Sequence, residues 1–137
     1  MAARLLARRA YTTAELVARL EQKGYRVETA ATTARRCVEL GWIDDARLAH
    51  DRAEALRGRG AGSLKIQADL ETRGLTPSLI ELAVAASLGE QSELEWARTA
   101  LARAKIDPED APARAWRLLA GRGFPDEILV TLVGEPD

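Results

Sequence analysis

Apolar and polar residues follow one another along the chain with the period of amphipathic helices. Leu16 and Leu20 lie four positions apart, and Ile66 and Leu70 repeat that spacing further along. Residues four apart share one face of an α-helix, so each pair predicts a buried stripe. The only stretch that could favour a strand, residues 128–133, fits a final helix equally well. The pattern therefore predicts an all-α protein.

Three segments share one plan, in which a short helix is followed by a basic residue, a glycine and a large apolar residue. These endings are Lys23-Gly24-Tyr25, Arg73-Gly74-Leu75 and Arg122-Gly123-Phe124. A glycine after a helix adopts a left-handed conformation that closes the last turn, and the apolar residue then packs back on the helix. Thr13 and Ser63, whose hydroxyls can accept a bond from a free amide of the first turn, are the predicted N-caps.

The three glycines recur at intervals of 50 residues (24 to 74) and 49 residues (74 to 123), which suits three helices per unit. A further helix is predicted before each segment, over residues 3–10, 44–57 and 92–104. Another follows each glycine, and the first of these carries an apolar stripe made of Val27, Ala30, Ala31, Ala34 and Val38. We predict an elongated array of three tandem three-helix repeats, about nine short helices, over residues 1–43, 44–89 and 90–137.

Composition and charge restrict where and with what the chain works. A single cysteine excludes an internal disulfide, and Arg4, Arg8 and Arg9 interrupt any apolar core near the N-terminus. No stretch is long and apolar enough for a membrane span, so we expect a cytoplasmic protein without membrane contact. Residues 1–60 hold 12 Lys/Arg against 8 Asp/Glu, and residues 61–137 hold 8 against 13, so net charges of +4 and −5 sum to −1. Such polarity suits an acidic partner at one end; a chance distribution of solvated charges is the alternative.

Candidates for catalysis are few, and we expect neither an enzyme, a metal site nor a cofactor. His50 is the only histidine and is expected to be solvated. Cys37 lies beside Val38, near the apolar stripe, and is expected in the core. Asp44 and Asp45 are expected to cap a helix, because acidic groups are favourable at its positive end.

The glycine-rich stretch 58–63 lacks the preceding strand and the lysine of a phosphate loop. It leads into a helix start flanked by Arg57, Arg59 and Lys65, which favours contact with a DNA phosphate or an acidic loop. A flexible connection between repeats is the alternative.

The remaining basic residues are the best candidates for partner contact. Arg4 and Arg8 share a helix face with Arg9 beside them, and Arg35 and Arg36 lie on the helix that closes the same unit. Together such cations give salt-sensitive affinity for phosphates; pairing with Glu15, Glu28 or Glu39 is the alternative. Trp42, Trp96 and Trp116 could stack on bases, but core packing is the favoured interpretation.

Three ordered motifs resemble the RecX family. Residues 41–49, Gly-Trp-Ile-Asp-Asp-Ala-Arg-Leu-Ala, are similar to its central signature of a glycine and an apolar pair followed by Asp-Asp-x-Arg-aromatic-Ala. Residues 59–66, continuing to Arg73-Gly74-Leu75, resemble its second signature. Residues 5–9, followed by Glu15-Leu16 and Lys23-Gly24-Tyr25, resemble its opening, so the likeness covers essentially the whole chain.

The resemblance implies an inhibitory regulator of the RecA recombinase in recombination, DNA repair and the SOS response. Proteins of this family bind RecA and its filament on single-stranded DNA and restrain its ATPase, strand-exchange and co-protease activities. We expect a monomer that lies in the filament groove. The residues assigned to RecA or DNA contact are Arg4, Arg8, Arg9, Arg35, Arg36, Arg57, Arg59, Lys65 and Arg73. The alternatives are an autonomous nucleic-acid-binding module and a helical adaptor for another protein.

Two positions depart from the family pattern. Leu48 replaces an aromatic residue, and Arg52 stands where the family commonly has an apolar one. Arg52 could extend its charge to the rim, pair with a carboxylate or join the binding surface, and structural accommodation is favoured. The acidic balance, with a pI of about 5.9, predicts only weak direct contact with DNA and favours protein contacts.

Overall fold

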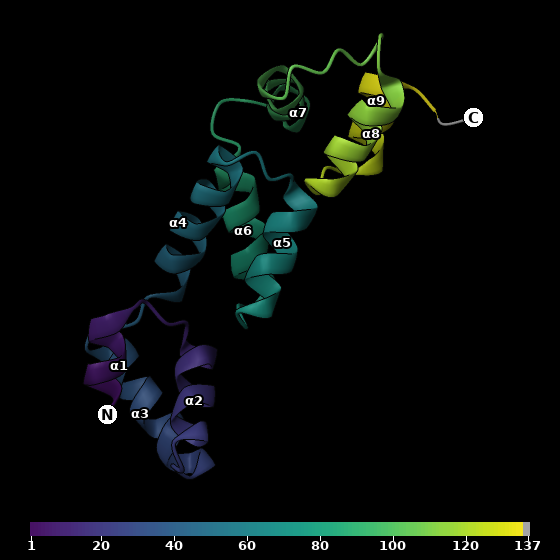
Figure 1. The fold of residues 1–137 in the computed structure, drawn as a ribbon. Coiled ribbons are helices and arrows are strands. Elements are labelled where there is room, and N and C mark those ends of the chain that lie inside the picture. Colours follow the sequence, from purple (N-terminus) through teal and green to yellow (C-terminus); the bar gives the residue numbers. More distant parts are fainter. Residues whose placement is uncertain (136–137) are drawn as a thin grey trace.

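The computed structural model describes residues 1–135, which form an elongated array of short helices (Figure 1). The helices are α1 (Ala2–Arg8), α2 (Thr13–Gln22), α3 (Val27–Glu39), α4 (Asp45–Gly58), α5 (Ser63–Thr72), α6 (Pro77–Ser87), α7 (Glu93–Arg103), α8 (Pro112–Gly121) and α9 (Asp126–Val133). No strand occurs in the described part of the chain, and residues 128–133 are helical, as one of the two interpretations predicted. The predicted all-α array of three-helix repeats is confirmed.

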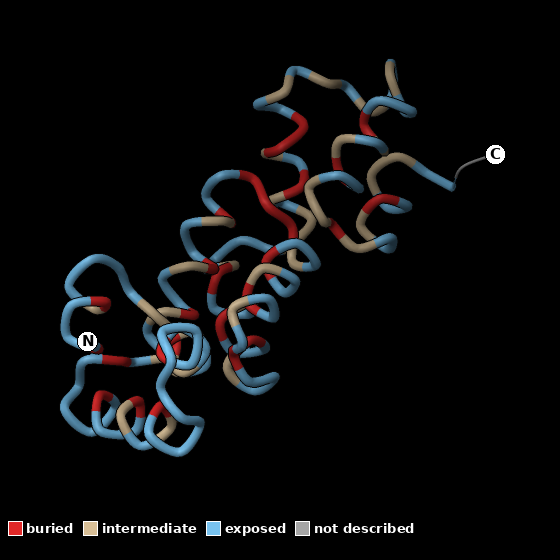
Figure 2. The backbone as a smooth tube through the Cα atoms, turned by 60° about the horizontal axis from the view of Figure 1, so that its bottom comes forward, coloured by how far each residue is buried: buried red, intermediate tan, exposed pale blue. Residues whose placement is uncertain are grey.

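The hydrophobic interior is divided into three separate clusters, one for each group of three consecutive helices. Helices that pack along one another belong to the same group. Figure 2 shows the buried residues following the chain from end to end in these groups, not gathered in one central core. Each repeat is therefore its own folding unit in terms of apolar packing, and neighbouring repeats meet chiefly through loops and helix ends.

The predicted glycine endings close α2, α5 and α8 as expected. Gly24, Gly74 and Gly123 have positive φ angles of 98°, 78° and 85°. The amides of Tyr25, Leu75 and Phe124 donate to carbonyls five residues earlier, at 3.1, 3.4 and 3.1 Å. Leu75 and Phe124 are buried, but Tyr25 is 41% exposed, so its predicted apolar contact is wrong. A phenol hydroxyl is better placed in water than against the small alanine-rich interior of the first repeat.

The predicted N-caps are each wrong by one residue. Thr12 caps α2, since its hydroxyl accepts the Glu15 N–H at 3.0 Å while the Glu15 carboxylate accepts the Thr12 N–H at 2.9 Å. This reciprocal pair occupies two amides that a hydroxyl at position 13 could not reach together. Gly62 caps α5, and Ser63 is its first helical residue.

The apolar stripe predicted on α3 is partly wrong. Val27 and Val38 are 62% and 45% exposed, whereas Ala30, Ala34 and Cys37 are buried. Small residues at this spacing let α3 approach α2 closely, which turns both valines away from the interior. Cys37 is in the core as predicted, and burial raises the pKa of its thiol.

Candidate interaction surface

The first junction between repeats joins the start of α2 to the end of α5. The Thr12 hydroxyl donates to the Arg73 carbonyl at 2.7 Å, and the Arg73 guanidinium donates to the Glu15 carboxylate at 3.0 and 3.1 Å. Arg9 also pairs with Glu15, at 3.3 Å, and lies over the Tyr11 ring at 4.6 Å. Burial raises the pKa of Glu15, but the bonds from Arg73 and Thr12 and the charges of Arg73 and Arg9 outweigh it and leave that pKa lowered. Arg73 is therefore committed to holding two repeats together.

A carboxylate from the following repeat caps the second helix of the preceding one at both junctions. Asp45, the first residue of α4, accepts the Thr13 N–H at 2.8 Å. Glu93, the first residue of α7, accepts the Ser63 N–H at 2.9 Å. Pro112 occupies the equivalent first position of α8 and has no N–H to offer. The two junctions thus use one recurring contact.

The second junction buries a charged network around Arg57. Its guanidinium donates to Glu93 at 2.9 Å, to Ser63 at 2.8 Å and to Ser87 at 3.2 Å, and its side chain is 1% exposed. Burial lowers the pKa of Arg57, while the charge and hydrogen bond of Glu93 act against that shift. No partner can reach this guanidinium, so the assignment of Arg57 to the contact surface is wrong. The cause is its pairing with Glu93, which lies 36 residues away in the sequence.

The glycine-rich stretch 58–63 crosses the end of α8 so closely that the two backbones form hydrogen bonds with each other. The Gly62 N–H donates to the Arg122 carbonyl at 2.7 Å, and the Leu64 N–H donates to the Gly123 carbonyl at 2.9 Å. With Ser63 capped by Glu93, these amides are occupied by protein acceptors. The predicted anion contact at this helix start is therefore wrong for the amides, and the stretch is a tight crossing of two loops.

Of the cations assigned from the sequence, the exposed ones form two groups, and Arg57 and Arg73 belong to neither. In the first repeat Arg4, Arg8 and Arg35 are exposed without a carboxylate partner among residues 1–135, and Arg36 pairs with Glu39 at 3.3 Å on the surface. Near the second junction, Arg59 and Lys65 are exposed.

Two further arginines join the second group and were not assigned from the sequence. Arg103 donates to the Gly58 carbonyl at 3.1 Å, and the guanidinium of Arg122 lies against Gly60. Both therefore bring positive charge beside Arg59. Only the docking of α7 and α8 on this loop places them there, so no signal in the sequence marks them.

The three tryptophans differ in their surroundings. Trp96 packs against the third cluster and donates its indole N–H to the Leu88 carbonyl at 2.9 Å, and Trp116 packs against the same cluster. Trp42 is 53% exposed, so the predicted core packing is wrong for this residue. It follows Gly41 in the tight turn after α3, where the next residue, Ile43, takes the buried position.

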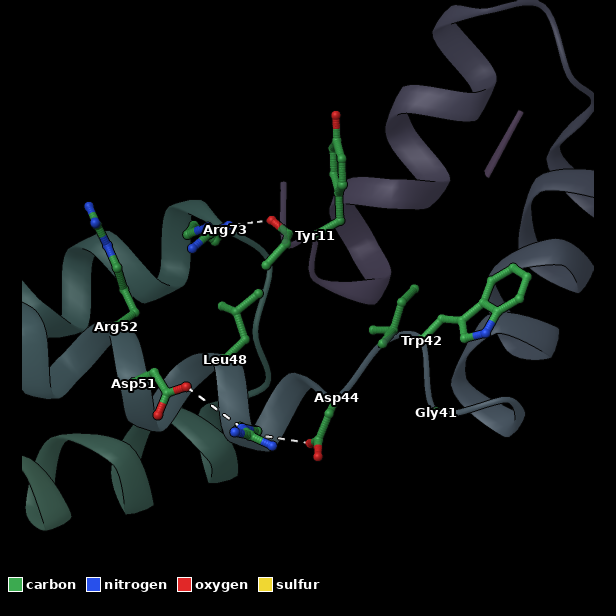
Figure 3. A pocket seen from close by; sticks show the side chains of 11 residues that line it. Tyr11, Gly41, Trp42, Asp44, Leu48, Asp51, Arg52 and Arg73 are labelled. Carbon is green, nitrogen blue, oxygen red and sulfur yellow. Dashed lines mark hydrogen bonds and ion pairs between the residues drawn. The ribbon is translucent and has the colours of Figure 1, made fainter. Parts of the chain in front are cut away.

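Trp42 stands at the edge of a groove of about 520 Å³ between the first two repeats. Figure 3 shows Trp42 and Arg52 at opposite ends of this groove, with Tyr11 and Leu48 between them. Arg52 donates to Asp69 through two bonds of 3.0 Å, which raise its pKa. The expected structural accommodation of Arg52 thus occurs through an ion pair.

The remaining polar candidates, Asp44 and His50, make contacts with residues of α4. Asp44 caps α4 by accepting the Arg47 N–H at 3.1 Å, as predicted. His50 is exposed and lies 3.5 Å from Glu54. Among residues 1–135 no three His, Cys, Asp or Glu side chains are grouped as metal ligands would be, and no helix there is long and apolar enough to cross a bilayer.

The fold and these contacts define an elongated helical repeat protein in which the exposed candidate cations lie on the first repeat and at the second junction. The family model described as RecX, first three-helix domain, matches residues 1–37. The regulatory protein RecX of Trichlorobacter lovleyi is 34% identical over 135 residues, covering 93% of this chain and 88% of that protein. The RecX of Chromohalobacter salexigens is 37% identical over 129 residues, covering 90% and 82%. This chain therefore belongs to the RecX family.

A solved structure agrees on the fold. The crystal structure of RecX from Lactobacillus salivarius superimposes with a TM-score of 0.78 at 17% sequence identity, over 96% of this chain and 89% of that one. At such low identity the similarity concerns the arrangement of helices, which is the one described above.

Proposed function

We propose that this chain is an inhibitory regulator of the RecA recombinase. It binds RecA and RecA filaments on single-stranded DNA, and it lowers their ATPase, strand-exchange and co-protease activities without catalysing a reaction or using a cofactor. This role places it in the cytoplasm, in homologous recombination, DNA repair and the SOS response. The observation that carries the proposal is the similarity over 93% of the chain to a regulatory protein RecX.

The shape of the array supports binding along a filament. Repeats over residues 1–43, 44–89 and 90–137 would each contact a successive RecA protomer, and a monomer suffices for this. Three linked contacts act at high effective concentration, so individually weak contacts add up to firm binding. A chain lying in the filament groove inhibits by occupying the space that DNA and other substrates need.

The exposed cations are the proposed contact residues. Those of the first repeat are Arg4, Arg8, Arg9, Arg35 and Arg36, and those of the second junction are Arg59 and Lys65, to which we add exposed Arg103 and half-buried Arg122. They suit acidic protein surface or DNA phosphate, and their affinity should fall with salt. The acidic balance of residues 61–137 weakens direct binding to DNA.

Titration of RecA ATPase on single-stranded DNA tests the proposal. Increasing amounts of this chain should lower the steady-state rate toward a plateau, and strand exchange should fall over the same range. An ATPase rate unchanged by molar excess of the chain contradicts the proposal and favours an adaptor for another protein. Tight, salt-sensitive binding to naked single-stranded DNA together with an unaffected RecA favours an autonomous nucleic-acid-binding module.

A paired substitution tests the first group of cations. Arg4→Ala/Arg8→Ala removes two exposed charges one helical turn apart and should raise the half-inhibitory concentration by about threefold to tenfold. Arg114→Ala/Arg117→Ala, two exposed arginines of α8, is the matched control and should leave it unchanged. Equal inhibition by both variants would remove the first repeat from the proposed surface.

A further inference from the structure

The groove between the first two repeats presents an exposed tryptophan from a closed turn. Gly41 has a φ of 75°, and the Trp42 N–H donates to the Cys37 carbonyl at 2.8 Å. Ile43, 4% exposed, anchors the same turn in the first cluster. The position of Trp42 is therefore fixed by its neighbours while half of its surface meets solvent. Tryptophan held in this way provides contact area at little entropic cost.

The groove has an apolar stretch beside Trp42, and two of its three cations are held by internal acids. Tyr11 and Leu48 line it beside Trp42. Three arginines of the second repeat line it, and two of them are bound by acids: Arg52 by Asp69 and Arg73 by Glu15. Each of these two guanidinium groups binds its carboxylate through Nε and Nη2 at 3.0–3.1 Å, so an internal acid already neutralises its charge.

The charge left at the rim is acidic. Asp44 and Asp51 both line the groove, and the Asp51 side chain is 64% exposed. Arg47 is the cation nearest to them, 81% exposed and 3.9 Å from Asp51, a separation at which a solvated pair contributes little. Because two carboxylates face one loosely placed guanidinium, the rim favours binding of a cationic group over binding of a phosphate.

We propose that this groove docks a segment of a partner protein, which places an apolar side chain against Trp42 and a Lys or Arg side chain beside Asp51. The proposal rests on the proposed function, so the partner is RecA, and it adds a contact of opposite chemistry to the basic surface. Nucleic acid does not fit, because its phosphates would meet Asp44 and Asp51. The two surfaces then have different roles. The exposed cations contact acidic surface, and the groove provides the contact that is specific for the partner protein.

Affinity for RecA filaments assembled on single-stranded DNA tests the apolar half of the proposal. Trp42→Ala should weaken binding by about tenfold or more, as for a central aromatic contact. Leu82→Ala is the control, because Leu82 is 68% exposed on α6 and lies outside the groove. Both variants should keep the unfolding free energy of the original chain, because both side chains are exposed.

Reversing the charge of Asp51 tests whether the groove binds a cationic protein segment or nucleic acid. Asp51→Lys should weaken filament binding by about threefold to tenfold, while Glu54→Lys, less than one turn away on the same helix and outside the groove, should have little effect. Tighter binding by Asp51→Lys would mean that the groove faces phosphate and would overturn the proposal. Wild-type affinity in both Trp42→Ala and Asp51→Lys would overturn it while leaving the regulatory function standing. If the original chain does not bind the filament, the proposed function itself fails and the groove proposal fails with it.

Discussion

The two junctions between neighbouring repeats share their backbone contacts. At each one, the start of the second helix of a repeat meets the end of the second helix of the next repeat. Thr12 donates to the Arg73 carbonyl through its hydroxyl, and Gly62 donates to the Arg122 carbonyl through its amide, both at 2.7 Å. A carboxylate on the first residue of the next repeat's first helix, Asp45 of α4 or Glu93 of α7, completes each contact. The repeats are thus placed by helix ends, where unpaired amides and carbonyls are available, and not by broad apolar faces.

The side chains around these contacts differ between the junctions. At the first, Arg73 and Glu15 are 19% and 23% exposed and border an open groove. At the second, Arg57 is 1% exposed, and the two backbones pass so closely that a Cβ on Gly62 would lie 2.5 Å from the Gly123 carbonyl carbon. Water and salt screen the first pair more than the second. We infer that the first junction yields more readily, while the second fixes repeats two and three as one body.

Loss of the buried charge should have the largest effect. Arg57→Ala leaves the Glu93 carboxylate without its cation and should lower the free energy of unfolding by about 3–5 kcal/mol, as for other broken buried pairs. Urea denaturation measures this, with exposed Arg59→Ala as the control, expected within about 0.5 kcal/mol of the original chain. Arg57→Met/Glu93→Gln should recover much of the loss, because it removes both charges. A loss below about 1 kcal/mol for Arg57→Ala would contradict the assignment of the second junction as the firmer one.

A methyl group at the second crossing should have an intermediate effect. Gly62 has an ordinary φ of −85°, so Gly62→Ala brings no backbone strain of its own, and any loss comes from the clash with Gly123 and Phe124. Separation of the backbones should lower the unfolding free energy by about 1–3 kcal/mol. Gly58→Ala, in a helix with open space at its Cβ, is the matched control and should be stabilising by about 0.5–1 kcal/mol. Losses of the same size at both glycines would point to local helix effects instead of the crossing.

At the first junction a smaller, condition-dependent effect is expected. The pKa of Glu15 lies below its ordinary value of 4.5, so the folded chain binds this proton less readily than the unfolded chain. Its contribution to stability is therefore present above about pH 4.5 and is lost as pH falls through the lowered pKa. Glu15→Gln should cost about 1 kcal/mol at neutral pH and should flatten the decline of stability toward about pH 3. Raising salt from about 0.1 M to about 1 M should reduce the difference in unfolding free energy between Glu15→Gln and the original chain. If that difference stays the same, salt does not screen the Glu15–Arg73 pair as its exposure implies.

The helices and their glycine endings could be predicted because their signals are local. A residue in left-handed conformation after a helix favours glycine whatever surrounds it, so Gly24, Gly74 and Gly123 marked three repeats without knowledge of the packing. The cap of α2 could also have been found, since Thr12 and Glu15 have the spacing of a reciprocal cap. In the pair Thr12-Thr13 either residue is a good N-cap on its own, so the hydroxyl alone does not decide where the helix begins.

The exposure of the candidate contact residues could be predicted only in part because it depends on how the repeats dock. Arg57 and Arg4 look alike in the sequence, yet Arg57 is buried at the second junction, where it pairs with Glu93, and Arg4 is exposed. For Trp42 the error has the opposite direction, because the sequence favours core packing and the side chain is exposed. Its neighbour Ile43 takes the buried position instead. Contacts distant in the sequence decide which arginine is paired and which tryptophan is exposed. The apolar pattern of a single helix carries no information about those contacts.

The smallest expected effect concerns the end of α7, which turns as α4 does but without a glycine. Lys105 has a φ of 58°, and the amides of Lys105 and Ile106 donate to carbonyls three and five residues earlier, as those of Gly60, whose φ is 99°, and Ala61 do. Lys105→Gly should therefore stabilise the chain by about 0.5–1 kcal/mol, because it relieves left-handed strain, whereas Lys105→Ala should bring no gain. Hydrogen exchange locates the gain: if the second junction couples its repeats, protection rises across α4 to α9 together and stays unchanged in α1 to α3. A gain confined to α7, α8 and α9 would show that the buried network at Arg57 joins the two repeats without making them unfold as one.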